Sequence, residues 1–203
     1  VLNPWNIDAL IELEAEYKNK VNAILQLRHH PEIIKLKKKV DSEDPDKIYE
    51  IDLTYITSRG KWYFTSWKGN EDKSGGIATN IGVHFFDMLQ WIFGPMTSFK
   101  VDIENRYTNS GSMNLLRAKI NWFLSIDSSN LPSEVKKVDN PTFRALKIGD
   151  EEIEFSKGFT NLHTTSYNKI LNGEGFNLLD TKPSIEIVSK ISNGSFDWKY
   201  INR

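Results

Sequence analysis

Three polar side chains, Asn80, His84 and Asp87, lie in an otherwise apolar stretch that follows a paired-glycine turn, Gly75–Gly76. Their spacings of four and three residues place them on one face of a helix. Burying a histidine or a carboxylate without a partner is costly, so these groups must be hydrogen-bonded or line a cavity. His84 could act as a general base, oriented by Asp87, because the pKa of a histidine lies near neutral pH. A core histidine that hydrogen-bonds a carbonyl is an equally good interpretation.

Basic side chains supply the next candidates. Arg28, at the end of a predicted strand, could hold a carboxylate or phosphate through two hydrogen bonds, although a surface arginine is the more common case. Lys68 and Lys73 lie in an aromatic-rich loop over residues 59–76 that is long enough to suggest a function. Aromatic faces beside cations suit sugar rings and anionic groups, and they also suit a loop that is simply anchored on the core.

Other site types find little support in the sequence. It contains no G-x-G-x-x-G loop, no P-loop and no G-x-S-x-G serine elbow. Cysteine is absent, which excludes disulfides and thiolate chemistry. The adjacent residues His29 and His30 point to different sides and would chelate a metal poorly, so we predict no metal site. His163 and Tyr167 repeat a four-residue polar spacing, which by itself is a weak signal.

The composition describes an ordinary globular chain. Its 203 residues, 39% of them hydrophobic, suffice for one sizeable domain or at most two small ones. The formal net charge of −1 argues against nucleic-acid binding, which needs a strongly basic face. No apolar run approaches the roughly 18 residues of a membrane span, and no signal-peptide pattern is present. We therefore expect a cytoplasmic protein with no nucleic-acid or membrane partner.

Hydrophobic periodicity predicts the elements that position the candidate residues. The pattern favours an α+β fold with an open, largely antiparallel mixed sheet and helices packed on one face. Gly94–Pro95 is expected to end the helix that carries His84, and residues 180–183 are expected to form a turn. The predicted helices are Ile7 to Lys18, Glu32 to Val40, Ala78 to Phe93, Leu162 to Leu171 and Pro183 to Ile191, and the predicted strands are Val21 to Leu27, Ile48 to Thr57, Ser98 to Tyr107, Leu115 to Ile126, Phe143 to Ile148 and Glu152 to Phe155.

The segment from Lys73 to Asp87 resembles a family signature, G-G-x-x-x-[DN]-x-G-x-H-x-x-D, of the glucose–fructose oxidoreductase and inositol dehydrogenase (Gfo/Idh/MocA) family. Within that family the chain is most similar to bacterial UDP-N-acetylglucosaminuronic acid 3-dehydrogenases of lipopolysaccharide and O-antigen biosynthesis. The blocks that carry this likeness are Val21 to Pro31, Arg59 to Gly94, Trp122 to Asp127 and Glu151 to Tyr167.

The resemblance implies a domain organisation. Family members join an N-terminal Rossmann domain, which binds NAD, to a C-terminal α+β domain that binds substrate and forms oligomer interfaces. Residues 1–5 resemble the segment just after the family's E-K-P lysine, so the resemblance implies that the Rossmann domain is absent here. We expect 1–203 to be a single substrate-binding and oligomerisation domain, with 1–19 as the linking helix. Such a fragment should bind no NAD and show no turnover, although its parent would be an NAD-dependent oxidoreductase acting on a CH–OH group.

The resemblance also implies roles for individual residues. His84 would be the catalytic acid/base at the 3-hydroxyl of a UDP-N-acetylglucosaminuronate-like substrate, and Asn80 would hydrogen-bond the sugar or the nicotinamide. Asn80 stands where many members have aspartate, which weakens any carboxylate relay through this position. The substrate-binding candidates are Arg28, Lys73, Ser74, Asn80, Asp87, His163 and Tyr167.

A non-catalytic sugar-nucleotide-binding module and an oligomerising scaffold are the alternatives, with a homo-oligomer formed through the exposed sheet face. Convergence of Arg28, Lys73, His84 and His163 on one cleft would favour the substrate domain. A sheet that is apolar on both faces would favour the scaffold.

Overall fold

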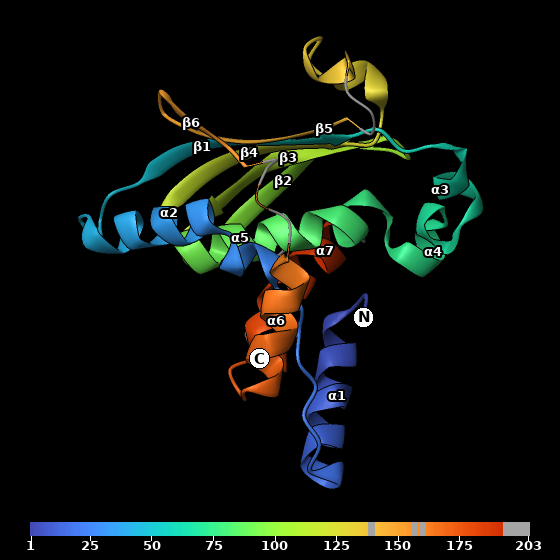
Figure 1. Cartoon of the computed structure of the whole chain (residues 1–203), viewed down its shortest axis with the longest axis vertical. Helices are drawn as coiled ribbons and strands as arrows, with labels where there is room; N and C mark the ends of the chain where they lie inside the picture. Colours follow the sequence, from blue (N-terminus) through green and yellow to red (C-terminus); the bar gives the residue numbers. More distant parts are fainter. Residues whose placement is uncertain (138–140, 156–157, 159–160, 193–203) are drawn as a thin grey trace.

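A six-stranded mixed sheet with helices on one face is the framework of the molecule (Figure 1). The computed structural model describes residues 1–137, 141–155, 158 and 161–192. The strand order is β2-β3-β4-β1-β5-β6; β1 and β4 are parallel and every other neighbouring pair is antiparallel. The predicted α+β fold with a largely antiparallel sheet is therefore confirmed. The strands are β1 Tyr49–Thr57, β2 Met96–Glu104, β3 Thr108–Leu115, β4 Ala118–Ser125, β5 Thr142–Ile148 and β6 Glu151–Glu154.

The helices form a layer beneath the sheet. In Figure 1, α2, α5 and α7 lie against the sheet, whereas α1 and α6 extend away from it. A π-helical turn, Ala78–Gly82, leads directly into α5, and Gly94, with φ 88°, ends α5 as predicted. The helices are α1 Pro4–Tyr17, α2 Pro31–Ser42, α3 Lys61–Thr65, α4 Glu71–Ser74, α5 Val83–Phe93, α6 Leu162–Leu171 and α7 Leu178–Ser192, and 3-10 turns cover Gln26–His29, Trp67–Gly69, Ser128–Asn130 and Val135–Lys137.

The two faces of the sheet differ in polarity. Alternate β1 residues, among them Ile51 and Leu53, are buried against the helices. The opposite face carries polar pairs: Lys119 Nζ lies 3.2 Å from Glu50 Oε1, and further pairs of this kind follow along the strands. Phe123 of β4 and Phe143 of β5 lie on the same face, opposite Thr54 and Ile56 of β1, so this face carries polar and apolar side chains together. Oligomerisation through it stays a prediction.

The core lies between the sheet and α5. Phe86 and Phe93 of α5 are fully buried, and the Phe86 ring packs edge-on against Trp122 of β4 with ring centroids 5.4 Å apart. Such aromatic edge contacts add to the stabilisation from area burial. Because α5 is fixed against the sheet along its length, the polar side chains that it carries are held in defined positions.

One predicted strand is wrong. Residues Val21 to Leu27 form no ladder; a single bridge pairs Ala23 with Phe176, and a 3-10 turn begins at Gln26. Their apolar alternation has another cause, because Leu25 and Leu27 are buried next to helices rather than on a sheet face. The loop predicted over residues 59–76 is likewise broken into short helices, α3 and α4.

One strand of the sheet, β3, was not predicted from the sequence. Strand β3 was missed because its serine, asparagine and glycine residues have low strand propensity, and it forms by pairing between β2 and β4.

The predicted turn at 180–183 is wrong, because these residues form the first part of α7. Asn177 and Asp180 each accept a hydrogen bond from the other's backbone N–H, at 3.0 and 2.8 Å, which is a capping box. Ser156, Lys157, Phe159 and Thr160 of the last matching block lie outside the described residues.

Candidate functional site

A cavity of about 520 Å³ opens where the π-helical turn and the start of α5 meet β1, β5 and α6. We call it the histidine cavity, because two histidines face it. Both polar and apolar side chains contribute to its wall, as is usual for sites that bind small molecules. The lining residues are Ile24, Gln26, Leu27, Tyr55, Arg59, Lys68, Asn80, Ile81, His84, Phe85, Arg144, His163 and Tyr167.

Four of the residues singled out from the sequence meet in this cavity. Asn80 and His84 come from the π-helical turn and the first turn of α5, and His163 and Tyr167 come from α6. The two pairs are about eighty residues apart in the chain, so their four-residue spacings belong to two helices that face one cleft. The structure therefore brings together the strong candidate His84 and the weak candidate His163.

The π-helical turn sets the direction of Asn80. Such wide turns are rare and occur frequently at functional sites. Here Gly82 allows a close approach, since a Cβ at this position would lie 2.7 Å from Phe86 and 2.9 Å from Leu124. Asn80 Nδ2 donates a hydrogen bond of 3.1 Å to the hydroxyl oxygen of Tyr63.

His84 is held as a neutral base. Burial, with a smaller contribution from the nearby His163, lowers the pKa of its imidazole from 6.5 to about 4. The ring keeps some accessible surface in the cavity although most of its surroundings are protein. At neutral pH the imidazole is unprotonated and can accept a proton from a bound hydroxyl group.

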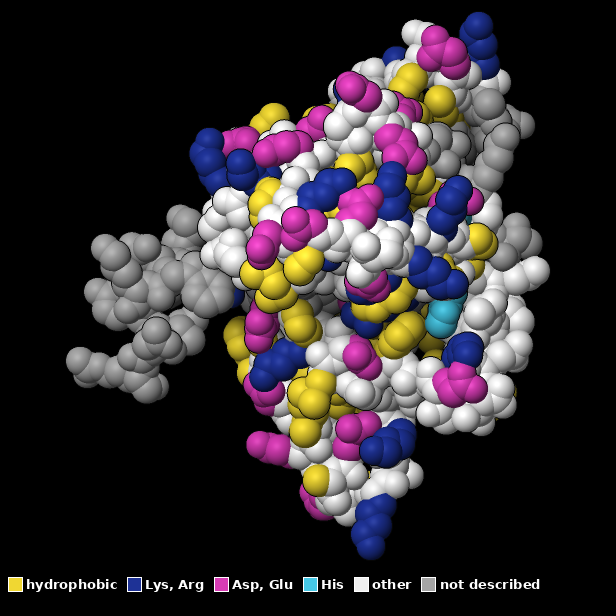
Figure 2. All heavy atoms as spheres, turned by 90° about the vertical axis from the view of Figure 1, so that its left-hand side faces the viewer, with side chains coloured by type: hydrophobic (Ala, Val, Ile, Leu, Met, Phe, Trp, Pro, Cys, Tyr) yellow, Lys and Arg dark blue, Asp and Glu magenta, His cyan; other side chains and the backbone are white. Residues whose placement is uncertain are grey.

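Three cations line the histidine cavity, and none of its described lining residues is acidic. Arg59 follows β1, Lys68 lies in the aromatic segment, and Arg144 is in β5 opposite Tyr55. Arg59 Nε is buried, and no described residue forms a hydrogen bond with it. Elsewhere the signs are mixed: Figure 2 shows a face on which basic and acidic side chains are interspersed. The concentration of positive charge in the cavity therefore favours an anionic ligand.

Sequence reasoning missed part of this wall. Arg59 and Arg144 were not among the candidates, and Lys68 was noted only as a cation in an aromatic loop. Arg59 follows directly after the predicted strand Ile48 to Thr57, and this position at the start of a loop was an available signal of a functional residue. Arg144 gave none, because it enters the cavity only through the pairing of β5 with β1.

Arg28 and Asp87 do not line the histidine cavity. Arg28 donates from Nε to Asp87 Oδ2 at 2.9 Å and from Nη2 to Asp87 Oδ1 at 2.7 Å. Its guanidinium also lies over the rings of Trp91 and Phe176, at 5.8 and 4.9 Å from their centroids. Burial raises the pKa of Asp87 while the hydrogen bonds from Arg28 oppose that rise. The structure thus engages both side chains in an internal ion pair.

Lys73 and Ser74 also lie apart from the histidine cavity. Lys73 is exposed on α4, and its backbone N–H donates a hydrogen bond to the side-chain oxygen of Asn70, the N-cap residue of that helix. Ser74 is buried, and its Oγ accepts a hydrogen bond of 3.2 Å from the backbone N–H of Gly76. Of the four residues whose convergence we used as a criterion, His84 and His163 meet, whereas Arg28 and Lys73 do not.

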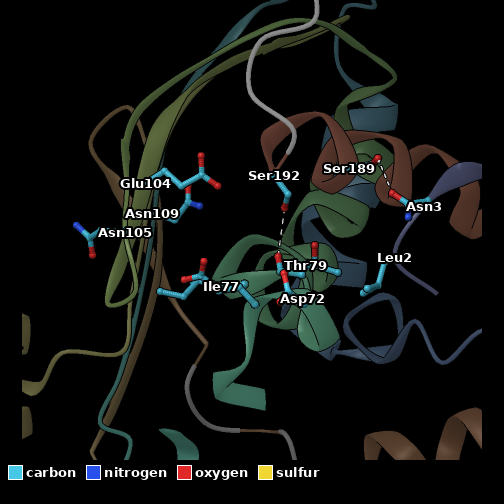
Figure 3. A pocket seen from close by; sticks show the side chains of 13 residues that line it. Leu2, Asn3, Asp72, Ile77, Thr79, Glu104, Asn105, Asn109, Ser189 and Ser192 are labelled. Carbon is cyan, nitrogen blue, oxygen red and sulfur yellow. Dashed lines mark hydrogen bonds between the residues drawn. The ribbon is translucent and has the colours of Figure 1, made fainter. Parts of the chain in front are cut away.

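A second cavity, of about 400 Å³, lies on the other side of the π-helical turn, and we call it the acidic cavity. Figure 3 shows Glu104, Asn105 and Asn109 on its strand side, with Asp72 and Thr79 on its helix side. Its described lining residues include no lysine or arginine. Burial and the neighbouring Glu71 raise the pKa of Glu104. The acidic cavity therefore repels anions, and the chemistry of an anionic sugar fits the histidine cavity instead.

The part of the chain that the structure describes contains neither a metal-binding cluster nor a membrane-spanning helix. Within those residues no group of three His, Asp or Glu side chains could hold a metal ion. None of the described helices is long and apolar enough to cross a membrane.

The chain is similar to proteins of one oxidoreductase family. Residues 37–120 match the model of an oxidoreductase family, C-terminal alpha/beta domain. YteT of Bacillus subtilis (strain 168) is 27% identical over 111 residues, which cover 53% of this chain and 26% of that protein. The family match over residues 37–120 runs from within α2 to the start of β4, and it includes the π-helical turn and His84.

Two solved structures are similar over nearly all of the chain, and both are of the WlbA (WbpB) dehydrogenase from Thermus thermophilus. The complex with NAD and alpha-ketoglutarate has a TM-score of 0.90 and 43% identity, and the complex with NAD and UDP-GlcNAcA has a TM-score of 0.89 and 42% identity. Each match covers 97% of this chain and 63% of the dehydrogenase, so the chain spans less than two thirds of those relatives. Residues 37–120 thus match this oxidoreductase family, and the chain has the fold of the family's C-terminal alpha/beta domain.

Proposed function

We propose that the chain is the substrate-binding part of an NAD-dependent dehydrogenase that oxidises the 3-hydroxyl of a UDP-N-acetylglucosaminuronate-like sugar nucleotide. The observation that carries this proposal is the histidine cavity, in which a neutral imidazole faces a wall whose described residues include three cations and no carboxylate. A UDP-linked uronate carries a diphosphate and a carboxylate, and its charge matches that wall. The similarity to a dehydrogenase solved with UDP-GlcNAcA supports the same ligand class.

The side chains of the cavity have separate tasks in this proposal. Arg59, Lys68 and Arg144 bind the anionic groups, since guanidinium groups match phosphate and carboxylate geometry. His84 accepts the proton of the sugar hydroxyl as the carbon that bears it is oxidised. Asn80 and His163, which also line the cavity, hydrogen-bond the sugar.

NAD would supply the hydride acceptor in the whole dehydrogenase. The described residues do not fit its pyrophosphate, which binds at a glycine-rich turn between a strand and a helix. The parallel strands β1 and β4 are not joined by such a turn, and the sequence has no G-x-G-x-x-G. We therefore assign this chain binding, orientation and proton transfer only, and we expect no NADH formation by the chain on its own.

Calorimetric titration of the chain with UDP-N-acetylglucosaminuronic acid tests the proposal. We expect saturable binding that weakens by about tenfold or more in Arg59→Gln, because hydrogen bonds to charged groups contribute about 1.5–3 kcal/mol. Lys100→Gln is the matched control: Lys100 is exposed on β2, pairs with Asp102 and does not line the cavity. Absence of binding by the wild-type chain, or equal binding by Arg59→Gln, would contradict the proposal.

A non-catalytic sugar-nucleotide-binding module is the alternative that shares this cavity. It predicts the same titration but no effect of His84 on the turnover of the whole dehydrogenase. The position of His84 in the wall of the cavity, beside the three cations, favours the catalytic role. The cytoplasmic location, the homo-oligomer and the role in lipopolysaccharide biosynthesis stay predictions.

A further inference from the structure

Tyr63 of α3 is buried directly behind the histidine cavity. Its side chain is 3% exposed and is not among the residues that line the cavity. The rings of Trp62 and Phe64 contact it edge-on, with centroids 6.0 and 5.4 Å away. A buried tyrosine held in this way has little freedom, so its hydroxyl group is a fixed point behind the wall.

The hydroxyl group of Tyr63 is hydrogen-bonded to the donor end of the Asn80 amide. Asn80 Nδ2 donates to Tyr63 Oη at 3.1 Å, and no hydrogen bond from a described residue reaches Asn80 Oδ1. An asparagine side chain has a donor end and an acceptor end, and fixing one end fixes the other. Asn80 therefore presents its carbonyl oxygen to a ligand as a hydrogen-bond acceptor.

Tyr63 also contacts one of the cavity's cations. The guanidinium carbon of Arg59 lies 5.9 Å from the centroid of the Tyr63 ring. An arginine over an aromatic face is attracted by the ring, most strongly where water is excluded. One buried side chain thus supports a neutral acceptor, Asn80, and a cationic donor, Arg59.

We propose that Tyr63 is a positioning residue that orients Asn80 as an acceptor for a hydroxyl or amide N–H of the sugar ligand. This inference rests on the proposed function, because it concerns the same cavity and the same ligand class. In the absence of the Tyr63 hydroxyl the amide can rotate, and its donor end then competes for the position that faces the ligand.

A double-mutant cycle tests the proposal, with UDP-N-acetylglucosaminuronic acid as the probe and calorimetry as the measurement. We expect Tyr63→Phe and Asn80→Ala each to weaken binding by about threefold to tenfold, the range of one hydrogen bond. We expect Tyr63→Phe to have less than about a twofold effect when Asn80 is already alanine. Tyr49→Phe is the matched control, because Tyr49 is also buried and donates to Glu43 Oε2 at 2.6 Å, far from the cavity lining.

A second readout keeps the test independent of folding. The side-chain NH₂ resonances of Asn80 should shift in Tyr63→Phe and stay unchanged in Tyr49→Phe. Additive losses in the double mutant, or unchanged binding by either single mutant, would overturn the positioning role while leaving the proposed function intact. Failure of the wild-type chain to bind the probe would overturn both, so the two failures are distinguishable.

Discussion

The guanidinium of Arg28 and the carboxylate of Asp87 form a two-hydrogen-bond ion pair that joins segments 59 residues apart in the chain. Their side chains are 9% and 3% exposed, and Arg28 Nη2 also donates to the backbone oxygen of Asp180 at 3.2 Å. The pair therefore connects the 3-10 turn before α2, the middle of α5 and the start of α7. It fixes α5, the helix that carries His84, on the side away from the sheet.

Removal of one partner of this buried pair should destabilise the fold strongly. We expect Asp87→Asn to lower the free energy of unfolding by about 3–5 kcal/mol, since it leaves the buried charge of Arg28 with only the more distant carboxylate of Asp180, 3.9 Å from Arg28 Nη1. Urea denaturation followed by circular dichroism measures the change. Asp102→Asn, which breaks the exposed pair with Lys100, should cost less than about 1 kcal/mol. Equal effects of the two substitutions would show that the internal pair has no special role.

The free energy of unfolding should decrease as the pH falls from 6.5 toward 4, the range in which His84 is protonated in the unfolded chain but not in the folded chain. Its pKa is 6.5 in the unfolded chain and about 4 in the folded chain, so between these values the unfolded state binds more protons. The contribution of His84 to the free energy of unfolding is therefore fully present above pH 6.5 and is lost progressively as the pH falls toward 4. His29, whose pKa burial also lowers, contributes in the same direction.

Urea denaturation at a series of pH values, for the wild type and for His84→Gln, isolates this contribution. The difference in unfolding free energy between the two proteins should be constant above pH 6.5 and should shift in favour of His84→Gln below it. A difference that is independent of pH would show that His84 titrates alike in both states.

In the whole dehydrogenase, His84→Asn should reduce turnover far more than binding. Loss of a general base typically costs about 10²- to 10⁴-fold in rate. The affinity for the sugar nucleotide should change by less than about tenfold, the range expected for one hydrogen bond. Steady-state NADH formation beside calorimetric titration separates the two effects. A turnover close to that of the wild type would support the non-catalytic alternative instead.

Gly111→Ala should disrupt the sheet next to the core. A Cβ at Gly111 would lie 2.1 Å from the backbone oxygen of Lys100 and 2.8 Å from the Trp122 ring. Because the first of these is backbone of the neighbouring strand β2, the strands must separate, and we expect a cost of about 1–3 kcal/mol or more. Gly149→Ala is a control without a steric clash, since nothing lies within 4 Å of its Cβ, although its positive φ adds some strain. A Gly111→Ala protein as stable as Gly149→Ala would contradict this packing.

Sequence periodicity predicted most of the fold because it is a local property. The helix of His84, strand β1 and helix α6 all show clear apolar repeats, and the structure has them close to the expected positions. Strand β3 could not be predicted in this way, because its polar residues become a strand only between two neighbours.

The candidate site was predicted in part, for the same physical reason. The helical spacing placed Asn80 and His84 together, as the structure does, but it also placed Asp87 on the same face, and Asp87 pairs with Arg28 outside the cavity. The pairing of Arg28 with Asp87 and the entry of Arg144 into the cavity depend on tertiary packing, which no local pattern reports. The resemblance of the whole segment to the family signature was therefore more informative about function than any single residue.

The most direct test of the account is a structure of the chain determined with UDP-N-acetylglucosaminuronic acid. We predict that the ligand lies in the histidine cavity, with its anionic groups against Arg59 or Arg144 and a ring hydroxyl within hydrogen-bond distance of His84. A ligand bound in the acidic cavity or elsewhere, or no bound ligand at saturating concentration, would contradict the account.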